Sequence, residues 1–562
     1  MRPGDAAAED TLARALGLAP LVCRLLVARG VTTPAAAGVF LDARLAQHLR
    51  SPMLFREMAA AADRVVTALN QGHRIGIYGD YDVDGVSGSA VLLRFLRALG
   101  HEPVVHIPQR LRDGYGVNEG GVRRLAEAGV RLMITVDCGA TAHREVRLAQ
   151  DLGIDTIVCD HHQVAQTPLP ALAVLNPVDP AAGFPFHGLC GAGVAFYLAL
   201  GVRARLRDAG HSTLPDVRRY LDLVTLGTIA DVVPLLEENR VLVKHGLREL
   251  GQTTRPGLVA LKSVSGVTTM SASAVGFRLA PRLNAGGRLA DAGRAVELLT
   301  TEDRARAEAL ATDLDLENRE RQAIEREILG EAFHRLEADH AFAERRSIVL
   351  ASPEWHPGVI GIVASRLVER FYRPTVLIAL DSAGLGRGSG RSIQNLNLHE
   401  AFTACADTLL AFGGHRMAAG LTIRADAVDP FAHAFEDAVR ARTRAEDFEP
   451  EALVDAEIGF DDVSDLLAER LTALEPHGPG NPEPVFFVRN VVVQSRRAVG
   501  ERHLKLYLRQ GTRALPAIGF GMADAPIEPG DSLDILCAIE HDQWNGTRVL
   551  QLRLRDYRAA RP

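Results

Sequence analysis

The sequence predicts an α/β protein with two α/β lobes on parallel-sheet cores, a long helix that joins them, and a small β-barrel at the carboxyl end. The chain has 562 residues, far more than the roughly 100–200 residues of one domain. Apolar runs alternate with helix-like segments in two separate regions. The carboxyl-terminal region instead carries short alternating runs with turn residues and no helix between them.

The expected organisation has five parts, whose borders follow changes in these patterns. The stretch TRAEDFEPE is charged and contains proline, so it is interpreted as the linker before the barrel. The expected parts are an N-terminal helical segment at 1–50, a first lobe at 51–300, the connecting helix at 301–345, a second lobe at 346–445 and the barrel at 450–562.

The first lobe opens with RIGIYGDYDVDG from Arg74, an apolar strand that ends in a turn. It continues with VSGSAVLLRFLRALG, whose apolar spacing fits a helix. Further strands are expected in 102–108, 131–140 and 155–162, with a helix at 141–151. Strands that alternate with helices predict a parallel sheet that binds its ligand at the carboxyl ends of the strands. Acidic residues stand at those ends.

Helical patterns dominate the middle of the chain. The region 191–250 is helix-like and contains LVTLGTIADVVPL, while 302–340 holds no proline and one glycine. Apolar residues recur at helical intervals in the second of these, which predicts one long helix with an apolar packing face. These residues are Leu310, Leu314, Ile324, Ile328, Ala332 and Leu336.

A second strand–helix–strand pattern begins near residue 346 with SIVLASPEWHPGVIGIVASRLVERFYRPTVLIAL. Beyond the linker, five short strands are expected in PVFFVRNVVVQSRRAVG, RHLKLYLRQG, RALPAIGFG, DSLDILCAIE and TRVLQLRLRDY. Strands in this number without an intervening helix are typical of a small closed barrel such as an OB-fold.

Composition narrows the functional classes. The chain is 47% hydrophobic and 24% charged, and it offers no window of about 18 uninterrupted apolar residues, so neither long disorder nor a membrane span is expected. The six cysteines form no CxxC pair, and the start MRPGDAAAED lacks a secretory pattern, which favours the cytoplasm. The net charge of −7 disfavours a protein that coats nucleic acid but is compatible with one basic groove.

Three aspartates crowd the motif GDYDVDG. Asp80, Asp82 and Asp84 alternate, so an extended strand would point all three carboxylates to one side. Like charges this close favour a bound cation. A solvated acidic turn or a calcium loop is the alternative, but Val91 stands at the twelfth position of that loop, where a calcium-binding glutamate belongs.

Three further acid-bearing elements follow. Asp137 ends the apolar run RLMITVDCGA, where it either binds a cation or caps the next helix. Asp160, His161 and His162 end DTIVCDHH and offer mixed oxygen and nitrogen ligands suited to Mn²⁺ or Mg²⁺, unless the histidines are a surface pair. Asp231 lies in the apolar LGTIADVVPL, where an unpaired charge would be costly.

Four such elements together are best explained by shared cations. Several carboxylates with few imidazoles favour a two-metal cluster over a structural zinc. Two metals can stabilise both the attacking and the leaving oxygen of a displacement at phosphorus, so phosphoester hydrolysis is the expected reaction class.

The motifs stand in an order that resembles the DHH phosphoesterase superfamily: GDYDVDG, ITVDCG, the literal Asp160-His161-His162 and LGTIADVVPL. Four later stretches, APRLNAGGRL, GRGSGRSIQNLNLHEA, GGHRMAAGL and PHGPGNPEPVF, resemble features of its bacterial RecJ subfamily, and the match covers about residues 50–562. The resemblance implies DHH and DHHA1 domains followed by an OB-fold. It also implies hydrolysis of single-stranded DNA from the 5′ end to 5′-mononucleotides, with two Mn²⁺ or Mg²⁺ ions, in recombination and repair.

The same resemblance implies roles for the acidic centre. The implied metal ligands are Asp82, Asp84, Asp137, His161 and Asp231, with Asp80 as an additional ligand or a water-orienting acid. Asp137 would bridge the two ions. His162 would face the scissile phosphate, and Asp160 would orient its neighbours from outside the ligand set.

Substrate contacts are implied mainly in the second half of the chain. The glycine-rich GRGSGRS, with Ser389 and Arg391, would bring backbone amides and a guanidinium to a phosphate, unless it is merely a flexible loop. The other expected contacts are Arg110, Arg282, Asn284, Arg288, His356 and His415, together with Trp355 if it is not packed. A stacking and basic groove in the barrel is expected from Phe486, Phe487, Tyr507, Arg496, Arg497, Arg502 and Arg509.

Two other functions stay open on the sequence alone. One is a DHH-type phosphodiesterase for short oligonucleotides or dinucleotides, which the barrel disfavours. The other is a non-catalytic Cdc45-like replication scaffold, which the complete set of motif residues disfavours.

The expected partners are single-stranded DNA, a single-strand-binding protein and a RecQ-like helicase, with no membrane. A cleft confined between two lobes would explain selectivity for single strands.

Overall fold

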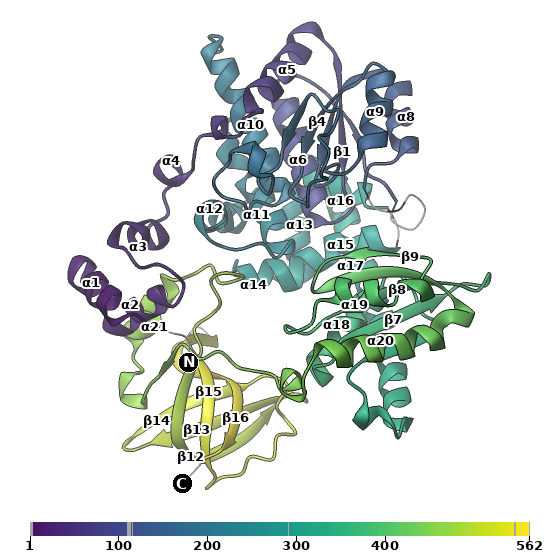
Figure 1. Cartoon of the computed structure of the whole chain (residues 1–562). Helices are drawn as coiled ribbons and strands as arrows, with labels where there is room; N and C mark the ends of the chain where they lie inside the picture. Colours follow the sequence, from purple (N-terminus) through teal and green to yellow (C-terminus); the bar gives the residue numbers. More distant parts are fainter. Residues whose placement is uncertain (1–3, 110–113, 115, 290, 545–546, 561–562) are drawn as a thin grey trace.

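The computed structural model describes residues 4–109, 114, 116–289, 291–544 and 547–560, so the expected substrate contact Arg110 lies outside the described residues. Figure 1 shows the first lobe at the top, the second lobe at the right, the barrel at the bottom and the N-terminal helices at the left. No helix within the described ranges is both long and apolar enough to cross a membrane.

The first lobe is built on a fully parallel five-stranded sheet, as the sequence predicts. The strand order is β2-β1-β3-β4-β5, and each pairing is parallel. Helices α5, α6 and α10 cover one face and α8 and α9 cover the other (Figure 1). The strands are therefore apolar runs buried on both sides. The bounds are β1 (Arg74–Gly79), β2 (Val104–His106), β3 (Val130–Val136), β4 (Asp155–Cys159), β5 (Ala173–Leu175), α5 (Met58–Gln71), α6 (Val83–Ala98), α8 (Glu119–Glu127), α9 (His143–Asp151) and α10 (Gly191–Asp208).

A layer of helices completes this lobe and brings two further segments to the carboxyl ends of the strands. Helix α11 packs against α6 and ends beside Asp231, and α15 approaches the loop after β1. The bounds are α11 (Leu221–Ala230), α12 (Glu237–Gln252), α13 (Pro256–Ser265), α14 (Ala272–Ala274), the π-helical turn Val275–Leu279, α15 (Ala280–Leu289) and α16 (Gly293–Thr300).

The long connecting helix α17 (Arg304–Ala338) is confirmed. Its apolar face is divided between two cores: Leu310 and Leu314 are buried in the first lobe, whereas Ile328 and Leu336 are buried in the second. Because both ends of the helix are packed, α17 sets the position of one lobe relative to the other.

The second lobe contains a mixed sheet, which differs from the parallel core that the sequence predicts. In the order β6-β7-β8-β10-β9, β6 pairs with β7 in parallel and the remaining pairings are antiparallel. The connection from Leu380 to Leu385 explains this, because so short a turn can join only antiparallel strands. The bounds are β6 (Ile348–Ser352), β7 (Thr375–Leu380), β8 (Leu385–Arg391), β9 (Ala411–Gly414), β10 (Ala418–Arg424), α18 (Ile360–Phe371), α19 (Leu398–Ala404) and α20 (Val428–Arg442).

The carboxyl-terminal strands form a closed barrel, as predicted. The pairing of β12 with β15 closes the order β12-β13-β14-β16-β15. The bounds are α21 (Asp465–Thr472), β11 (Ala456–Glu457), β12 (Phe486–Val499), β13 (His503–Gln510), β14 (Arg513–Gly519), β15 (Ser532–Trp544) and β16 (Thr547–Ala559).

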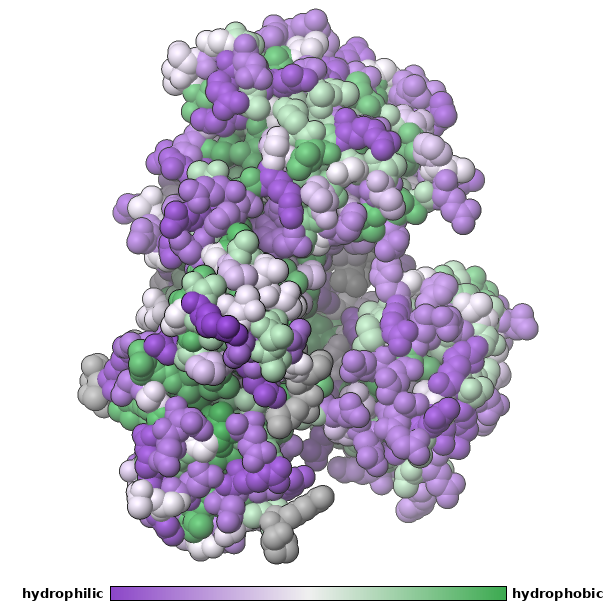
Figure 2. Space-filling view, turned by 60° about the vertical axis from the view of Figure 1, so that its left-hand side comes forward, coloured by the Kyte–Doolittle hydropathy of each residue, from purple (hydrophilic) through white to green (hydrophobic). Residues whose placement is uncertain are grey.

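The N-terminal helices share their core with the barrel at the other end of the chain. Leu12 and Val22 are buried in the same apolar cluster as Phe486 and Val488. Figure 2 shows a hollow between this part of the molecule and the second lobe at the lower right. The bounds are α1 (Ala6–Leu16), α2 (Pro20–Val27), α3 (Pro34–Leu41) and α4 (Leu45–His48).

Candidate metal centre

The first acidic segment lies where the chain turns from β1 into α6. The strand ends at Gly79, so the expectation that three alternating aspartates share one extended strand is wrong. Asp82 instead caps α6, and its carboxylate accepts hydrogen bonds from the N–H groups of Asp84 (2.9 Å) and Gly85 (3.2 Å). Asp84 then lies in the first helical turn. The turn still delivers these carboxylates to one centre, because α6 starts at the carboxyl edge of the sheet.

Asp84 is held by the start of a second helix. Its side chain is buried, and its two carboxylate oxygens accept hydrogen bonds from the backbone N–H groups of Gly191 (2.5 Å) and Ala192 (2.9 Å) in α10. The partial positive charge of a helix N-terminus stabilises an anion there. Helix α10 therefore fixes the position of this carboxylate.

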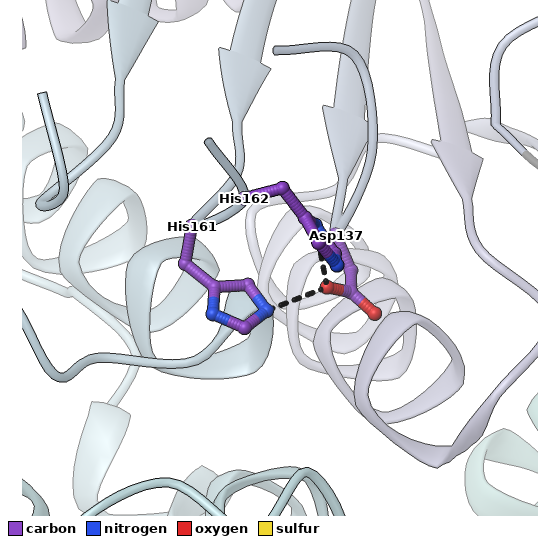
Figure 3. A group of neighbouring side chains, drawn as sticks. All are labelled: Asp137, His161 and His162. Carbon is purple, nitrogen blue, oxygen red and sulfur yellow. Dashed lines mark hydrogen bonds and ion pairs between the residues drawn. The ribbon is translucent and has the colours of Figure 1, made fainter. Parts of the chain in front are cut away.

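Asp137 follows β3 in a left-handed backbone conformation, with φ of 63°. Its N–H donates to the carbonyl oxygen of Cys159 at the end of β4 (2.9 Å), which ties the two strand ends together. Its Oδ1 lies 3.1 Å from Nε2 of His161 and 3.8 Å from Nδ1 of His162 (Figure 3). A non-glycine residue with positive φ is strained, and such strain concentrates at functional sites.

The ligand atoms form three overlapping groups, each within 4.8 Å. Asp137 and His161 each belong to two of them. Asp231, just after α11, joins through its Oδ2, which lies 3.5 Å from Nε2 of His161. The groups are Asp80 with Asp82 and Asp137, Asp84 with His161 and Asp231, and Asp137 with His161 and His162. The structure thus brings together the six residues expected to ligate metal.

Burial raises the pKa of the carboxyl groups of Asp84, Asp137 and Asp231, and the neighbouring carboxylates raise it further. The pKa of Asp231 rises to about 9. So many buried carboxylates repel one another in the ionised form unless a cation compensates them. Carboxylate oxygens combined with imidazole nitrogens match the ligands of Mn²⁺ and Mg²⁺, so the residues present fit such ions.

The two histidines differ in charge. Burial lowers the pKa of His161, which favours the neutral ring that a metal requires. Burial acts in the same direction on His162, but the hydrogen bond between its Nδ1 and Oδ1 of Asp160 (2.8 Å) and the charge of that carboxylate raise its pKa to about 9. The contact with Asp160 therefore favours the protonated ring of His162, which suits it to contact a phosphate.

Asp160 orients the loop without joining the ligand groups. Its carboxylate accepts hydrogen bonds from the N–H of Ala140 (2.7 Å), from the N–H groups of His161 (2.7 Å) and His162 (3.1 Å), and from the His162 ring. These bonds fix the tautomer and direction of His162.

Asp160→Asn is expected to lower metal-dependent turnover by about 10–100-fold, the usual cost of losing a partner that orients a ligand. The new amide must place an NH₂ group against one of the backbone N–H donors. Initial rates with saturating Mn²⁺ would measure the effect. Asp151→Asn, at an exposed carboxylate that ends α9, is the matched control, and equal rates for both variants would contradict this role.

Two glycines that the sequence analysis did not single out make room for the centre. A Cβ on Gly191 would lie 2.6 Å from the Cβ of Asp137, and a Cβ on Gly227 would lie 2.5 Å from Oδ1 of Asp84. Any side chain at either position would displace a residue of the ligand groups. For Gly191 the available sequence signal is the Gly-Ala-Gly that opens an apolar helix.

Several expected substrate contacts gather around the start of α18. The Arg288 guanidinium donates to the carbonyl oxygen of Gly358 (3.0 Å), in the loop that carries His356. A Cβ on Gly361 would lie 2.8 Å from Oγ of Ser389 and 3.0 Å from a guanidinium nitrogen of Arg391, so these side chains face the same helix end. The gathered residues are Arg288, His356, Ser389 and Arg391.

The stretch GRGSGRS is a strand rather than the phosphate-binding or flexible loop that its composition suggested. It forms β8 in the middle of the sheet, where its backbone groups pair with β7 and β10 and cannot cradle a phosphate. The glycines face the apolar side, since a Cβ on Gly388 would lie 2.6 Å from Leu421. The alternation of a strand then turns Ser389 and Arg391 to the other side.

The other expected contacts serve different roles. Asn284 accepts a hydrogen bond from the N–H of Val83 (3.1 Å), so it supports the loop that carries the first aspartates. Arg282 pairs with Asp315 on α17 (2.8 Å). His415 is exposed in the turn between β9 and β10.

Two aromatic contacts need correction. Trp355 is 3% exposed and its indole N–H donates to Glu331 (2.6 Å), so it is packed against α17. Phe486 is fully buried in the barrel core and cannot stack on a base. Phe487 lies on the outer side, with a guanidinium over its ring at 4.9 Å, and Tyr507 is 43% exposed.

A cavity of about 720 Å³ adjoins the centre. It is lined by residues on both sides of Asp231, by α15, α17 and α18, and by the turn at 477–479. Its lining residues include the apolar Val232 and Phe277, the basic Arg326 and Arg366, and Glu325, which pairs with Arg366 (3.3 Å). The mixture of apolar and cationic groups suits a polyanion with apolar rings.

His477 lines this cavity, and its burial produces a testable pH dependence. Burial lowers the pKa of its imidazole from 6.5 to about 4. The unfolded chain therefore binds the proton more tightly. The stability that the neutral ring of His477 contributes is fully present above pH 6.5 and is lost as the pH falls towards 4. His477→Gln is expected to reduce the slope of unfolding free energy against pH in this window by up to about 1.4 kcal/mol per pH unit, measurable by urea denaturation. Unchanged slopes would contradict the buried neutral ring.

Three family models match the chain in the order of its parts. The model of the DHH family, N-terminal domain, matches residues 74–228, the DHHA1 domain matches 345–441, and the RecJ OB domain matches 454–556. The parallel sheet with acids at its strand ends is thus the DHH domain, and the mixed sheet is the DHHA1 domain. The fold and the site together define the class: this is a DHH protein with a DHHA1 lobe and an OB barrel.

Curated relatives and solved structures narrow this further. The chain is 38% identical to "Single-stranded-DNA-specific exonuclease RecJ" of Bacillus subtilis (strain 168), over 97% of this chain and 69% of the relative, and 34% identical to the Escherichia coli (strain K12) protein of the same name, over 95% of each. The crystal structure of RecJ in complex with Mn²⁺ from Thermus thermophilus matches with a TM-score of 0.85 and 34% identity, covering 100% of this chain and 79% of that one. The chain belongs to the RecJ family.

Proposed function

We propose that this chain is a metal-dependent exonuclease that hydrolyses single-stranded DNA from the 5′ end to 5′-mononucleotides, in DNA recombination and repair. The observation that carries the proposal is that Asp137 and His161 are each shared between two groups of ligand atoms, as expected where two cations lie side by side. The names of the curated relatives, which are single-stranded-DNA-specific exonucleases, support the same substrate.

Two Mn²⁺ or Mg²⁺ ions would be held by Asp80, Asp82, Asp84, Asp137, His161 and Asp231, and Asp137 would be shared between them. When bound, such ions supply the charge that makes a water nucleophilic near neutral pH and neutralises the leaving oxygen. The chain's own residues prepare the reaction. Helix α10 holds Asp84 through two amides, and Asp160 keeps a proton on Nδ1 of His162, which leaves the rest of that ring to contact the scissile phosphate.

The proposed grip on the strand combines both lobes. Arg288, His356, Ser389 and Arg391 at the start of α18 would bind the 5′ end, and Arg110, Arg282, Asn284 and His415 are proposed to assist. The strand would then follow the adjoining cavity towards the barrel. Because α17 is packed into both lobes, this passage is held at a set width, which would admit one strand and exclude a duplex.

Digestion of one single-stranded DNA with Mn²⁺, labelled at the 5′ end in one sample and at the 3′ end in another, tests the proposal. Immediate release of 5′-labelled mononucleotide, with the 3′ label released last, is the expected result. Release from the 3′ end first would overturn the direction. Activity on dinucleotides alone would assign the chain to the small-substrate phosphodiesterases, and equal digestion of a blunt duplex would remove the confined passage.

The division of the chain and its setting in the cell are further proposals. We place the domain borders at 1–50, 51–300, 301–345, 346–445 and 450–562, which agrees with separate apolar cores for the two lobes. A single-strand-binding protein and a RecQ-like helicase are proposed as partners, and the cytoplasm as the compartment. Co-purification of either protein with the full chain would test the partnership.

A further inference from the structure

The turn PHGPGNP, residues 476–482, packs against the loop that follows Asp231. The N–H of Leu235 donates to the carbonyl oxygen of Pro479 (2.8 Å). A Cβ on Gly478 would lie 2.7 Å from the side chain of Leu235, so the two segments are packed too closely for a side chain at this position. This turn leads from α21 into the barrel. The barrel is therefore joined to the first lobe beside the acidic centre and its cavity.

Arg240 on α12 holds this junction from the first lobe. It is 2% exposed and is one of the largest fully buried side chains among the described residues. Its Nε donates to the carbonyl oxygen of Phe40 (2.7 Å) at the end of α3. Its other nitrogens donate to the carbonyl oxygens of Ala473 (3.4 Å), Glu475 (3.0 Å) and Pro476 (3.4 Å). One guanidinium thus binds the N-terminal helices and the approach to the barrel at once.

This cation is costly to bury. No ion pair joins Arg240 to a carboxylate of the described residues, and burial, with Arg29 nearby, lowers its pKa to about 10. The carbonyl oxygens and the ring of Phe40, whose centroid lies 3.7 Å from the guanidinium carbon, replace its water. An apolar residue of similar size would fill the space at lower cost. A contribution to stability therefore does not explain why this position is charged. The rigid set of N–H donors does, because it fixes the geometry of the segments around the guanidinium.

A second buried cation continues the network on the barrel side. Arg29, in the turn after α2, pairs with Asp455 (3.2 Å), with both side chains at most 1% exposed, and its Nε donates to Asn481 (2.8 Å). The Asn481 amide donates to the carbonyl oxygens of Leu474 (2.7 Å) and Pro476 (2.9 Å). Pro476 thus accepts from both Arg240 and Asn481. The N-terminal helices, the turn and the barrel are tied together and then tied to α12.

We propose that Arg240 is a positioning residue that locks the turn 476–482, and with it the barrel and the N-terminal helices, onto the first lobe. The proposal rests on the proposed function, because the lock keeps a bound strand aligned between the barrel and the acidic centre. The position of Asp231 does not depend on these contacts alone, since its N–H donates to the carbonyl oxygen of Gly227 within α11 (2.9 Å). Loss of the lock therefore weakens the grip on long strands and spares hydrolysis of a substrate too short to reach the barrel.

The test compares Arg240→Met with Arg248→Met, a matched change at an exposed arginine of the same helix, in the full chain with Mn²⁺. The substrates are a long oligodeoxythymidine and a 5′-phosphorylated thymidine dinucleotide. For Arg240→Met, KM for the long strand is expected to rise at least about tenfold, as when a second binding module is released, while kcat and KM for the dinucleotide stay at the control values. Identical KM values for the long strand in both variants would overturn the lock.

Asn481→Ala acts on the same turn from the barrel side and carries the test if Arg240→Met does not fold. It is expected to show the same split between long and short substrates, and small-angle X-ray scattering is expected to show a larger radius of gyration than for the control. An equal loss on both substrates, or an unchanged radius with an unchanged KM, would overturn the proposal. Failure of the wild type on both substrates would instead refute the proposed function.

Discussion

Asp137→Ala is expected to lower Mn²⁺-dependent digestion of single-stranded DNA by at least about 10³-fold, because removal of a shared ligand costs several kcal/mol of transition-state stabilisation. Asp137 belongs to two of the three ligand groups, so no other single carboxylate change disturbs more of the centre. Initial rates of nucleotide release from a 5′-labelled strand would measure the loss.

The control is Asp208→Ala, which removes an exposed carboxylate at the end of α10 and should leave the rate unchanged. Metal binding can be followed separately, since Mn²⁺ should raise the Tm of the wild type and of the control by mass action but not that of Asp137→Ala. A variant that keeps more than a tenth of the wild-type rate would show that Asp137 is not the shared ligand.

Gly191→Ala is expected to reduce the same activity by about 10²-fold or more and to cost about 1–3 kcal/mol of stability through overpacking. The added Cβ would meet the Cβ of Asp137 at 2.6 Å and Oδ2 of Asp84 at 3.0 Å. The helix start must move, and the amides that hold Asp84 move with it. Rates at saturating Mn²⁺ and urea unfolding of the metal-free chain would measure the two effects.

Gly193→Ala, two residues further along α10, is the matched control. The one contact of its Cβ below 3.5 Å would be with the end of the Leu189 side chain, at 3.3 Å, and that side chain can shift. Activity near the wild-type value is expected for it. If Gly191→Ala were equally active, the close approach of α10 to the ligands would have no functional role.

The acidic centre could be predicted from the sequence because parallel strands end at one edge of a sheet. Asp137 and His161 follow apolar runs, and that single rule places their side chains together although 24 residues separate them. Asp231 could be singled out because an unpaired charge among apolar residues is costly, but its place in the centre depends on where α11 ends, and a helical pattern does not tell that.

Two motifs adopt a backbone that differs from the predicted one, for a common reason. The alternating aspartates of GDYDVDG predict an extended strand and the glycines of GRGSGRS predict a loop, yet the first turns into a helix at Val83 and the second is a central strand. Glycines and aspartates occur in turns, caps and crowded strands alike. Which of these forms is adopted depends on what lies opposite, such as Leu421 against Gly388, and that partner is distant in the sequence.

The sequence by itself determined the order of the parts, the parallel sheet and the acids at its edge, because hydrophobic period and strand-end position are local properties of the chain. Only the tertiary structure decided the mixed sheet of the second lobe, the room that Gly191 leaves for Asp137, and the buried contacts of Arg240 with Phe40 and Pro476. These depend on how closely segments approach in space. No local pattern records that distance.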